Sequence, residues 1–432
     1  MNKLLICLLI MISGSSWAQQ EEVEKYNFED FELIVKVEDQ ENYFNKMLQE
    51  NPEDKSKTKE YNLYRVVLAT GWLAKGNIEK YNYYMQTNPE ISGKNLIYLS
   101  YVLEDLVEEP KYQSIVAKIS KDIIDDIEKN AKSDEIANLR LQVLLEVNAM
   151  ANAKLGDIDV ALKNIQKSSE IKDGAREMKY FKDSKSNYYN RYAIVLSAAG
   201  KDKMALDTLV YAVRHADSNP KLVKTLREVY KKVHGNDKGA DKLISDLQKE
   251  AYEKEYEEVE KLYIAESTIP FQGVISDPSG NGETFPLFNA TKPIHEISLP
   301  DLNGNTINFN DHKGKVLVID FWTTICTPCI AAFAGFERVV SEYKKEPFQL
   351  FIIDLFETQR TVKSFITKKG ISLDVLRDEP NGAYGINGTP TKIVFDTMGN
   401  IRFYSSGYAG STDREYYKLK AMVEITKTES KI

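Results

Sequence analysis

The sequence predicts two regions of different fold class: an all-α region at the N-terminus and an α/β region at the C-terminus. From about residue 20 to residue 266, apolar residues recur with helical spacing, and within 51–266 the prolines are only Pro52, Pro89, Pro110 and Pro220. From residue 294 onward, near-continuous apolar runs alternate with helical patterns, which is typical of a sheet with helices on its faces. Between the two regions, Pro and Gly crowd together as in a connection. We expect a helical domain at 19–266, a linker at 267–292 and an α/β domain at 293–432.

Composition narrows the classes of function. The chain has 432 residues, 42% hydrophobic and 28% charged, which is the composition of a globular protein. Its formal charge of −8 gives no support to a nucleic-acid partner, which would require a basic face. Three cysteines cannot form a four-cysteine zinc site, and the four histidines lack ligand spacing. We therefore expect neither a metal nor another cofactor.

Residues 1–18 have the order of a secretory signal peptide. Lys3 precedes the unbroken apolar run Leu4–Ile12, and small residues stand at the −3 and −1 positions if cleavage follows Ala18. The run is too short to cross a bilayer as a helix. The alternative is a retained anchoring helix. We expect a mature protein that is periplasmic or otherwise extracytoplasmic and that keeps two of its three cysteines.

A weak internal repeat runs through the helical region. Gly156 and Gly200 are each preceded by an alanine seven residues earlier and followed by an alanine five residues later, at positions 149, 161, 193 and 205. A glycine can form the turn of a helical hairpin, and alanines let the paired helices approach closely. The pattern resembles tetratricopeptide-type hairpins; the step from Gly200 to Gly235 is near that family's repeat length, whereas the step from Gly156 to Gly200 is longer. An irregular helical bundle is the alternative, and the frequent tyrosines are expected to fill helix interfaces.

The C-terminal elements can be assigned in order. Asn303-Gly304 indicates a hairpin turn, and Lys368-Lys369-Gly370 indicates the end of a helix. The expected strands are 294–299, 306–309, 316–321, 348–356, 371–376, 391–396 and 401–404, and short strands at 271–275 and 284–288 are an option. The expected helices are 326–345, 358–369 and 414–426.

Cys326 and Cys329 stand three residues apart at the expected start of a helix. One helical turn brings the two sulfur atoms within disulfide reach, and the helix N-terminus favours the thiolate of the first cysteine. We expect Cys326 to be the exposed nucleophile and Cys329 to be the more buried resolving thiol. Two alternatives are less favoured. A zinc site would need further cysteines or suitably spaced histidines, which the sequence lacks, and a structural disulfide that closes so small a loop would contribute little stability.

The residues around the cysteines resemble the thioredoxin family. The run from Asp320 to Cys329 reads Asp-Phe-Trp-x-x-x-Cys-x-Pro-Cys, and 297–305 with 313–316 is similar to the extracytoplasmic TlpA/ResA subfamily. The resemblance covers about residues 290–428. It implies a thioredoxin-like fold with an added N-terminal hairpin, and an extra strand–helix element at 357–378.

The resemblance also implies roles for further residues. Asp320 matches the buried acid that accepts a proton from the resolving cysteine. Trp322, Thr389 and Pro390 match substrate-contacting positions, with Pro390 in a cis peptide bond; a solvated Asp320 and a trans Pro390 are the alternatives. Thr327 and Pro328 occupy the dipeptide that tunes the reduction potential. Ile325 departs from the family's usual tryptophan, and the apolar segment 330–334 is interpreted as core, with a contact surface as the alternative.

Taken together, the residues and the resemblance predict an extracytoplasmic thiol-disulfide oxidoreductase. The direction implied is reduction of disulfides in a substrate protein, with electrons supplied by a membrane-bound thiol protein. A peptide or protein partner on the helical domain is expected as well. One alternative is a non-catalytic binding scaffold. Another is a thiol peroxidase, because Thr323 and Cys326 supply half of a peroxiredoxin motif, although Ile319 replaces its proline.

Overall fold

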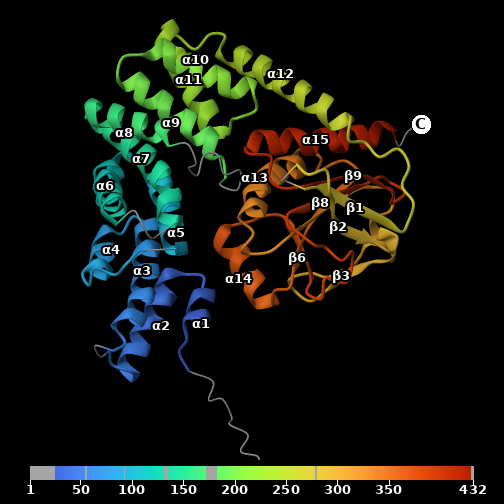
Figure 1. The fold of residues 1–432 in the computed structure, drawn as a ribbon, viewed down its shortest axis with the longest axis horizontal. Helices are drawn as coiled ribbons and strands as arrows, with labels where there is room; N and C mark the ends of the chain where they lie inside the picture. The colour runs from blue at the N-terminus through green and yellow to red at the C-terminus, as the bar shows by residue number, and fades with distance from the viewer. Residues whose placement is uncertain are drawn as a thin grey trace, which may run out of the picture.

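The computed structural model describes residues 25–53, 56–91, 93–130, 135–171, 182–277 and 280–429. The expected signal peptide, residues 1–18, lies outside the described residues. Figure 1 shows an arc of helices beside a domain built on a β-sheet. No helix of the described ranges is both long and apolar enough to cross a membrane.

The N-terminal half is helical along its described length. Its α-helices are α1 (Phe28–Leu33), α2 (Val37–Glu50), α3 (Thr58–Ala74), α4 (Ile78–Met85), α5 (Gly93–Leu106), α6 (Gln113–Asn130), α7 (Glu135–Leu155), α8 (Ile158–Glu170), α9 (Ser184–Ala198), α10 (Asp202–Arg214), α11 (Pro220–His234) and α12 (Ala240–Glu260), with a short 3₁₀ helix at Pro110–Tyr112. Gly156 and Gly200 form the α7–α8 and α9–α10 turns with φ of 92° and 74°, a conformation that glycine adopts without steric cost.

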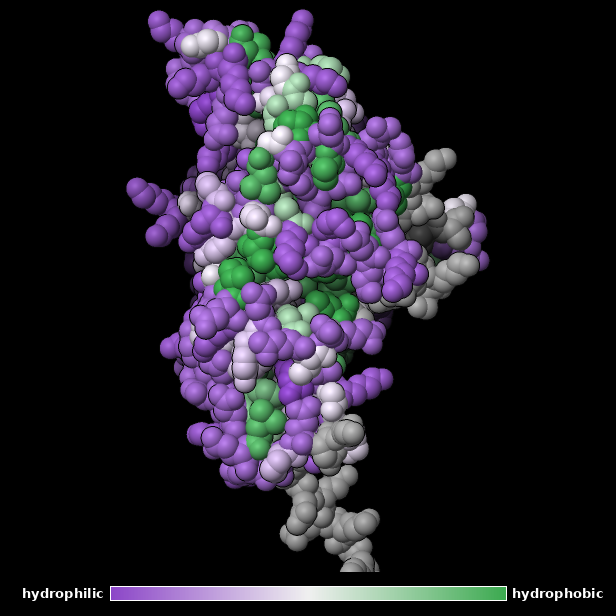
Figure 2. Space-filling view, turned by 90° about the vertical axis from the view of Figure 1, so that its left-hand side faces the viewer, coloured by the Kyte–Doolittle hydropathy of each residue, from purple (hydrophilic) through white to green (hydrophobic). Residues whose placement is uncertain are grey.

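Small and aromatic residues fill the space between these helices, as the sequence predicts. The alanines beside the turn glycines are buried. Among the tyrosines of α3 and α4, Tyr61, Tyr64, Tyr81 and Tyr84 are buried, whereas Tyr83 is exposed. Helical hairpins are thus present, whereas the tetratricopeptide assignment remains a prediction. Figure 2 shows the side of the molecule on which the arc lies at the left of Figure 1. Hydrophilic side chains cover most of this side, with a broken row of apolar ones between them.

The C-terminal half is built on a five-stranded sheet of order β7-β6-β5-β8-β9. Strands β5, β6 and β7 are parallel, and β8 and β9 are antiparallel additions beyond β5. The strands and helices are β5 (Val316–Trp322), α13 (Thr327–Glu342), β6 (Phe348–Leu355), α14 (Gln359–Lys369), β7 (Asp374–Asp378), β8 (Thr391–Phe395), β9 (Ile401–Ser406) and α15 (Thr412–Glu429). The three helices cover one face of the sheet.

Two β-hairpins pack against the other face of the sheet. Strands β1 (Phe271–Ser276) and β2 (Thr284–Ala290) are antiparallel, and so are β3 (Ser298–Pro300) and β4 (Thr306–Asn308). Leu287 and Phe288 of β2 are buried in the same apolar cluster as the sheet residues. The stretch 267–292, expected to be a linker, therefore contains a hairpin that covers part of the core.

The expected strand 294–299 is wrong in its first half. Ile294–Glu296 form a 3₁₀ turn, and β3 begins only at Ser298. Ile294 and Ile297 are both buried, because residues three apart lie on one side of a 3₁₀ turn. Expected helix 358–369 and the strand after it agree with α14 and β7 apart from their ends.

The helical arc contacts the sheet domain at both of its ends. Helix α1 lies against α14, where Ser364 Oγ donates to the Leu33 carbonyl over 2.6 Å. At the other end, α12 packs along α15. The charged C-terminal part of α12 buries Val259 and places Tyr252 and Tyr256 against the sheet domain's helical face. The arc is therefore attached to the sheet domain near both of its ends (Figure 1).

A buried ion network inside the arc gives a first test. Arg191 donates to Glu146 and Glu104 over 3.1 Å each, and all three side chains are largely buried. We expect Arg191→Met to lower the free energy of unfolding by about 3–5 kcal/mol, because it removes the cation that pairs with the buried Glu146, whereas Glu104 keeps its pair with Arg140. Chemical denaturation followed by circular dichroism measures this.

The matched control is Arg227→Met, which removes an exposed pair with Asp241. Such surface pairs contribute about 0–1 kcal/mol. Equal denaturation midpoints for the Arg191 variant and the unmodified protein would show that the network does not stabilise the arc.

Candidate active site

The two cysteines lie where β5 ends and α13 begins. All seven residues of β5 are buried, and the chain leaves the sheet at Trp322 and enters α13 at Thr327. Cys326 is the N-cap residue of α13, and Cys329 lies in its first turn. They form a disulfide, with their Cα atoms 5.3 Å apart. The helix N-terminus thus directs its free N–H groups and positive dipole end toward the first sulfur.

The expected exposure of Cys326 is wrong in degree. Cys326 is 8% exposed and Cys329 is fully buried, so both cysteines belong to the apolar cluster beneath α13. The order between them is as expected, since Cys326 is the outer one. The residue that reaches solvent at this point is Ile325, which is 87% exposed.

Trp322 does not lie on the surface, contrary to its expected role in substrate binding. It is fully buried, with its ring 5.2 Å from the ring of Phe333 and 5.7 Å from that of Phe365. Strand β5 is the central strand, and α13 and α14 cover this face of it, so a side chain pointing there enters the core. Trp322 packs the site from below and cannot contact a substrate on the surface.

The loop before β8 lies at the same edge of the sheet as the cysteines. The Thr389–Pro390 bond is cis, as the resemblance implies. Thr391 is paired with Phe321 of β5, which places Pro390 beside the end of that strand. Thr389 is half-buried and Pro390 is buried.

Asp320 lies in the interior on the α13 side of β5. Asp320 is only 1% exposed, and its Oδ1 atom has no hydrogen-bond partner among the described residues. Burial raises the pKa of Asp320 to about 8, and the charge of Lys392 acts in the opposite direction. The alternative of a solvated strand-end Asp320 is therefore wrong. A carboxyl group with this pKa can both hold and release a proton near neutral pH.

Two acids on the neighbouring strand were not predicted from the sequence. Glu357 accepts hydrogen bonds from the backbone N–H of Thr324, over 2.6 Å, and from its hydroxyl. Asp354 is fully buried, and desolvation, followed by contact with Glu357, raises its pKa to about 9. Asp354 lies near the end of the buried parallel strand β6, next to β5, and Glu357 lies two residues beyond its end. This position was the signal that could have revealed them, since the ends of parallel strands meet at one edge of a sheet.

Further residues surround the cysteine loop. Phe356 precedes Glu357 and is 61% exposed, with a φ of 68°. Thr327 and Pro328 are half-buried in the first turn of α13. Ala331, Ala332 and Phe333 are buried, which confirms the core interpretation of this apolar segment.

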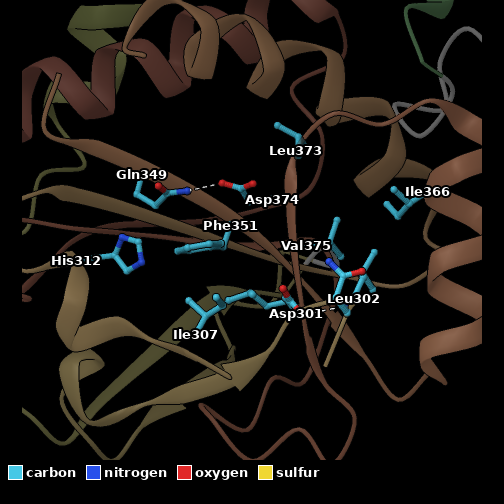
Figure 3. Close-up of a pocket in the computed structure, with 12 residues that line it drawn as sticks. Asp301, Leu302, Ile307, His312, Gln349, Phe351, Ile366, Leu373, Asp374 and Val375 are labelled. Carbon is cyan, nitrogen blue, oxygen red and sulfur yellow. Dashed lines mark hydrogen bonds between the residues drawn. The ribbon is translucent and has the colours of Figure 1, made fainter. Parts of the chain in front are cut away.

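A cavity of the sheet domain lies away from the cysteines. A hollow of about 410 Å³ is lined by residues of β4, β6, β7 and α14 and by the loop 301–303 that follows β3. Figure 3 shows His312, Gln349, Phe351 and Asp374 around it, and neither cysteine is among its lining residues. Within the described ranges, no cluster of three or more His, Cys, Asp or Glu side chains is arranged to hold a metal ion.

Comparisons with known proteins agree with this geometry. The family model described as AhpC/TSA family matches residues 290–404. Thiol-disulfide oxidoreductase ResA of Halalkalibacterium halodurans is 29% identical over 125 residues, which cover 28% of this chain and 71% of that protein. ResA of Bacillus thuringiensis is 31% identical over 113 residues, covering 26% and 65%. A putative thiol:disulfide interchange protein DsbE from Chlorobium tepidum is 24% identical, covers 30% and 96%, and has a TM-score of 0.28.

The C-terminal half is therefore a thioredoxin-like domain, and its class is that of the thiol-disulfide oxidoreductases. Within this class it is similar to the ResA proteins. The chain spans about two thirds of the length of the ResA proteins that it matches. The family match begins at residue 290, after the last helix of the arc. The matches to the ResA proteins cover less than a third of the chain.

The raised pKa of Asp320 predicts a pH-dependent stability. The folded protein keeps the Asp320 proton that the unfolded chain releases, so the contribution of Asp320 to stability falls as pH rises from about 4 to about 8 and then levels off. Asp320→Asn removes this titration. We expect the variant to be more stable than the unmodified protein, by a margin that grows across this interval, in thermal unfolding of the disulfide form.

The control is Asp241→Asn, which changes an exposed carboxyl group on α12. Its unfolding temperature should follow that of the unmodified protein at each pH. A margin for Asp320→Asn that stays constant or shrinks with rising pH would contradict a buried, protonated Asp320.

Proposed function

We propose that this protein is an extracytoplasmic thiol-disulfide oxidoreductase that reduces disulfides in substrate proteins with the Cys326–Cys329 dithiol. The observation that carries the proposal is the cysteine pair at the N-terminus of α13, directly above a buried acid. The similarity to ResA proteins, named thiol-disulfide oxidoreductases, supports it.

The first step is attack by the Cys326 thiolate on one sulfur of a substrate disulfide. A bond forms between Cys326 and that sulfur, the substrate S–S bond breaks, and the released substrate thiolate takes up a proton. The positive end of the α13 dipole stabilises the Cys326 thiolate before attack.

The second step is attack by Cys329 on the Cys326 sulfur. The Cys329 thiol must lose its proton first, and the Asp320 carboxylate is the base proposed to accept it. The mixed disulfide then breaks and the second substrate thiol leaves. Two electrons and two protons have passed to the substrate, and the enzyme holds the Cys326–Cys329 disulfide described above.

Turnover requires a reductant for this disulfide. We propose a membrane-bound thiol protein as the electron donor, which would carry out the same exchange in reverse. Thr327 and Pro328, between the cysteines, are proposed to tune the reduction potential. The signal peptide at 1–18 is proposed to export the chain to the periplasm or an equivalent compartment.

The substrate is proposed to bind across the loops that surround Cys326. The Thr389 backbone, before the cis Pro390, is positioned to pair with an extended segment. Ile325 and Phe356 offer exposed apolar side chains on two loops joined by the Thr324–Glu357 hydrogen bonds. The helical arc, proposed as a separate domain at 19–266 with tetratricopeptide-like hairpins, is a further surface for a peptide or protein partner.

Variants of the two cysteines test the function. We expect Cys326→Ser to abolish reduction of insulin and of model disulfides, because the remaining described cysteine, Cys329, is fully buried. We expect Cys329→Ser to accumulate a covalent mixed disulfide with the substrate, because the resolving thiol is missing. Turnover assays and non-reducing gels with mass spectrometry measure the two effects.

Two results would reject this function. Unchanged disulfide reduction by Cys326→Ser would remove the proposed nucleophile. Rapid peroxide consumption by the reduced protein, in place of disulfide reduction, would favour the thiol peroxidase alternative.

The role proposed for Asp320 predicts a pH profile. Only its carboxylate form accepts the Cys329 proton, so the rate of the second step should rise as pH passes through about 8. Asp320→Asn should remove this component and slow the step by about 10- to 100-fold near neutral pH. Single-turnover release of the second substrate thiol provides the rate, and an unaltered profile in the variant would rule out Asp320 as the base.

A further inference from the structure

The first turn of α15 joins the helical arc to the buried centre of the catalytic domain. We take this turn to include Ser411, which directly precedes the helix, together with the helical residues Thr412 to Glu415. The first four of these five residues bind residues of the arc. Ser411 donates its hydroxyl to the Ala216 carbonyl, and Thr412 bonds Asp183 through both its backbone N–H and its hydroxyl, the latter over 2.8 Å. These groups are all buried, so this contact is continuous with the protein interior.

The next two residues complete the attachment. The Asp413 backbone N–H donates to the Ser218 carbonyl over 3.2 Å, and its carboxylate accepts from the Ser218 hydroxyl. Arg414 pairs with Asp217 over 2.9 Å and with Glu255 of α12 over 3.0 Å. The position of this turn is therefore set by two loops and one helix of the arc.

The fifth residue, Glu415, points the other way, into the catalytic domain. Its carboxylate pairs with the ammonium group of Lys392 and accepts the Ala409 backbone N–H over 2.9 Å. Lys392 lies directly opposite Asp320 in the β5–β8 pairing, so their side chains share one face of the sheet. The pair of Lys392 and Glu415 is buried and borders the proposed proton acceptor.

We propose that the first turn of α15 couples the helical arc to Asp320, with Glu415 as a positioning residue that holds the Lys392 ammonium away from the Asp320 carboxyl. The inference rests on the function proposed above and adds a control by the arc to it. A partner protein or peptide that binds the arc and displaces the loops at Asp183 or at 216–218 would move this turn, and the ammonium group with it.

The charges around Asp320 define what such a movement would do. Lys392 of β8 and Glu415 of α15 are the charged groups that face Asp320, and α13 contributes the two cysteines. Glu415 faces Lys392 and the hydroxyl of Tyr408, which also contacts Asp183. Arg338 of α13 pairs with Asp413 in the same turn. The Lys392 ammonium also lies 4.4 Å from the centre of the Phe336 ring, which carries no charge. If Glu415 loses its charge, the Asp320 carboxylate is therefore the stronger of the two remaining partners of this ammonium.

Loss of the Glu415 carboxylate should therefore transfer the ammonium to Asp320. An opposite charge within about 4–6 Å favours the carboxylate and typically lowers the pKa of an acid by about one to three units. Asp320 would then accept the Cys329 proton at lower pH. Because coupling between two sites is reciprocal, reduction of the cysteines would also change affinity for a partner on the arc.

The experiment uses the full mature chain and the pH profile of the second, resolving step. Glu415→Gln should move the profile midpoint to lower pH by about one unit or more. Asp183→Gly removes the Thr412 contacts at a position whose φ of 54° suits glycine, and should shift the midpoint in the same direction by a smaller amount. The matched control Asp241→Asn, elsewhere on the arc, should leave the midpoint unchanged.

A charge-removal variant separates coupling from general damage. In the double variant Lys392→Gln with Glu415→Gln no ammonium remains to move, so the midpoint should return toward that of the unmodified protein. If Glu415→Gln does not fold, the Asp183→Gly result decides, since that variant leaves the ionic pair intact.

The outcomes distinguish this inference from the function on which it rests. If the unmodified protein transfers no electrons to disulfides, the proposed function fails. If it does, but Glu415→Gln and Asp183→Gly keep its pH midpoint, the function stands and the coupling is overturned. The coupling is also overturned if the double variant shifts as far as Glu415→Gln alone.

Discussion

Burial of β5 on both faces is the constraint on which the rest of the catalytic domain depends. Six of the seven residues of β5 are apolar or aromatic, the exception being Asp320, and the strand lies in the middle of the sheet. That location removes water from the Asp320 carboxyl group and raises its pKa. The same strand ends in Trp322, which anchors the turn to α13 in the core and so fixes where the cysteines emerge.

The helices and the hairpins cover opposite faces of the sheet. Helices α13, α14 and α15 cover the face that carries Asp320, and the two hairpins cover the other. Parallel pairing of β5 with β6 brings Glu357 to the loop before the cysteines, where it holds Thr324. Antiparallel pairing with β8 brings Lys392 and Pro390 to the opposite flank. The order of the strands therefore determines which residues lie on each side of the cysteine loop.

The sequence predicted what is encoded locally. The cysteine spacing, the helix that follows, the buried acid and the Thr389–Pro390 bond each depend on a short motif, and the structure agrees with the geometry expected of each. The exposure of Cys326 and Trp322 was mispredicted, because it depends on which distant helices cover them. Glu415 and the attachment of Asp183 to Thr412 could not be predicted, since those contacts join segments far apart in the chain. The 271–290 hairpin was visible only as an option, because its glycines and prolines suit a loop equally well.

The arc and the catalytic domain share a polar, buried contact at one end and a second contact at α14. Polar groups that are buried and fully paired specify one arrangement more strongly than apolar surfaces do. This arrangement gives the arc a fixed position relative to the cysteines, which is what selection or control of substrates by the arc requires.

The reduction potential of the Cys326–Cys329 pair tests the central claim most directly. It can be measured by equilibrating the mature protein with defined thiol–disulfide buffers and quantifying the free thiols. A protein that reduces substrate disulfides should have a potential near that of thioredoxin, about −270 mV. A value near about −120 mV, as in a strong oxidant, would contradict the proposed direction of electron flow.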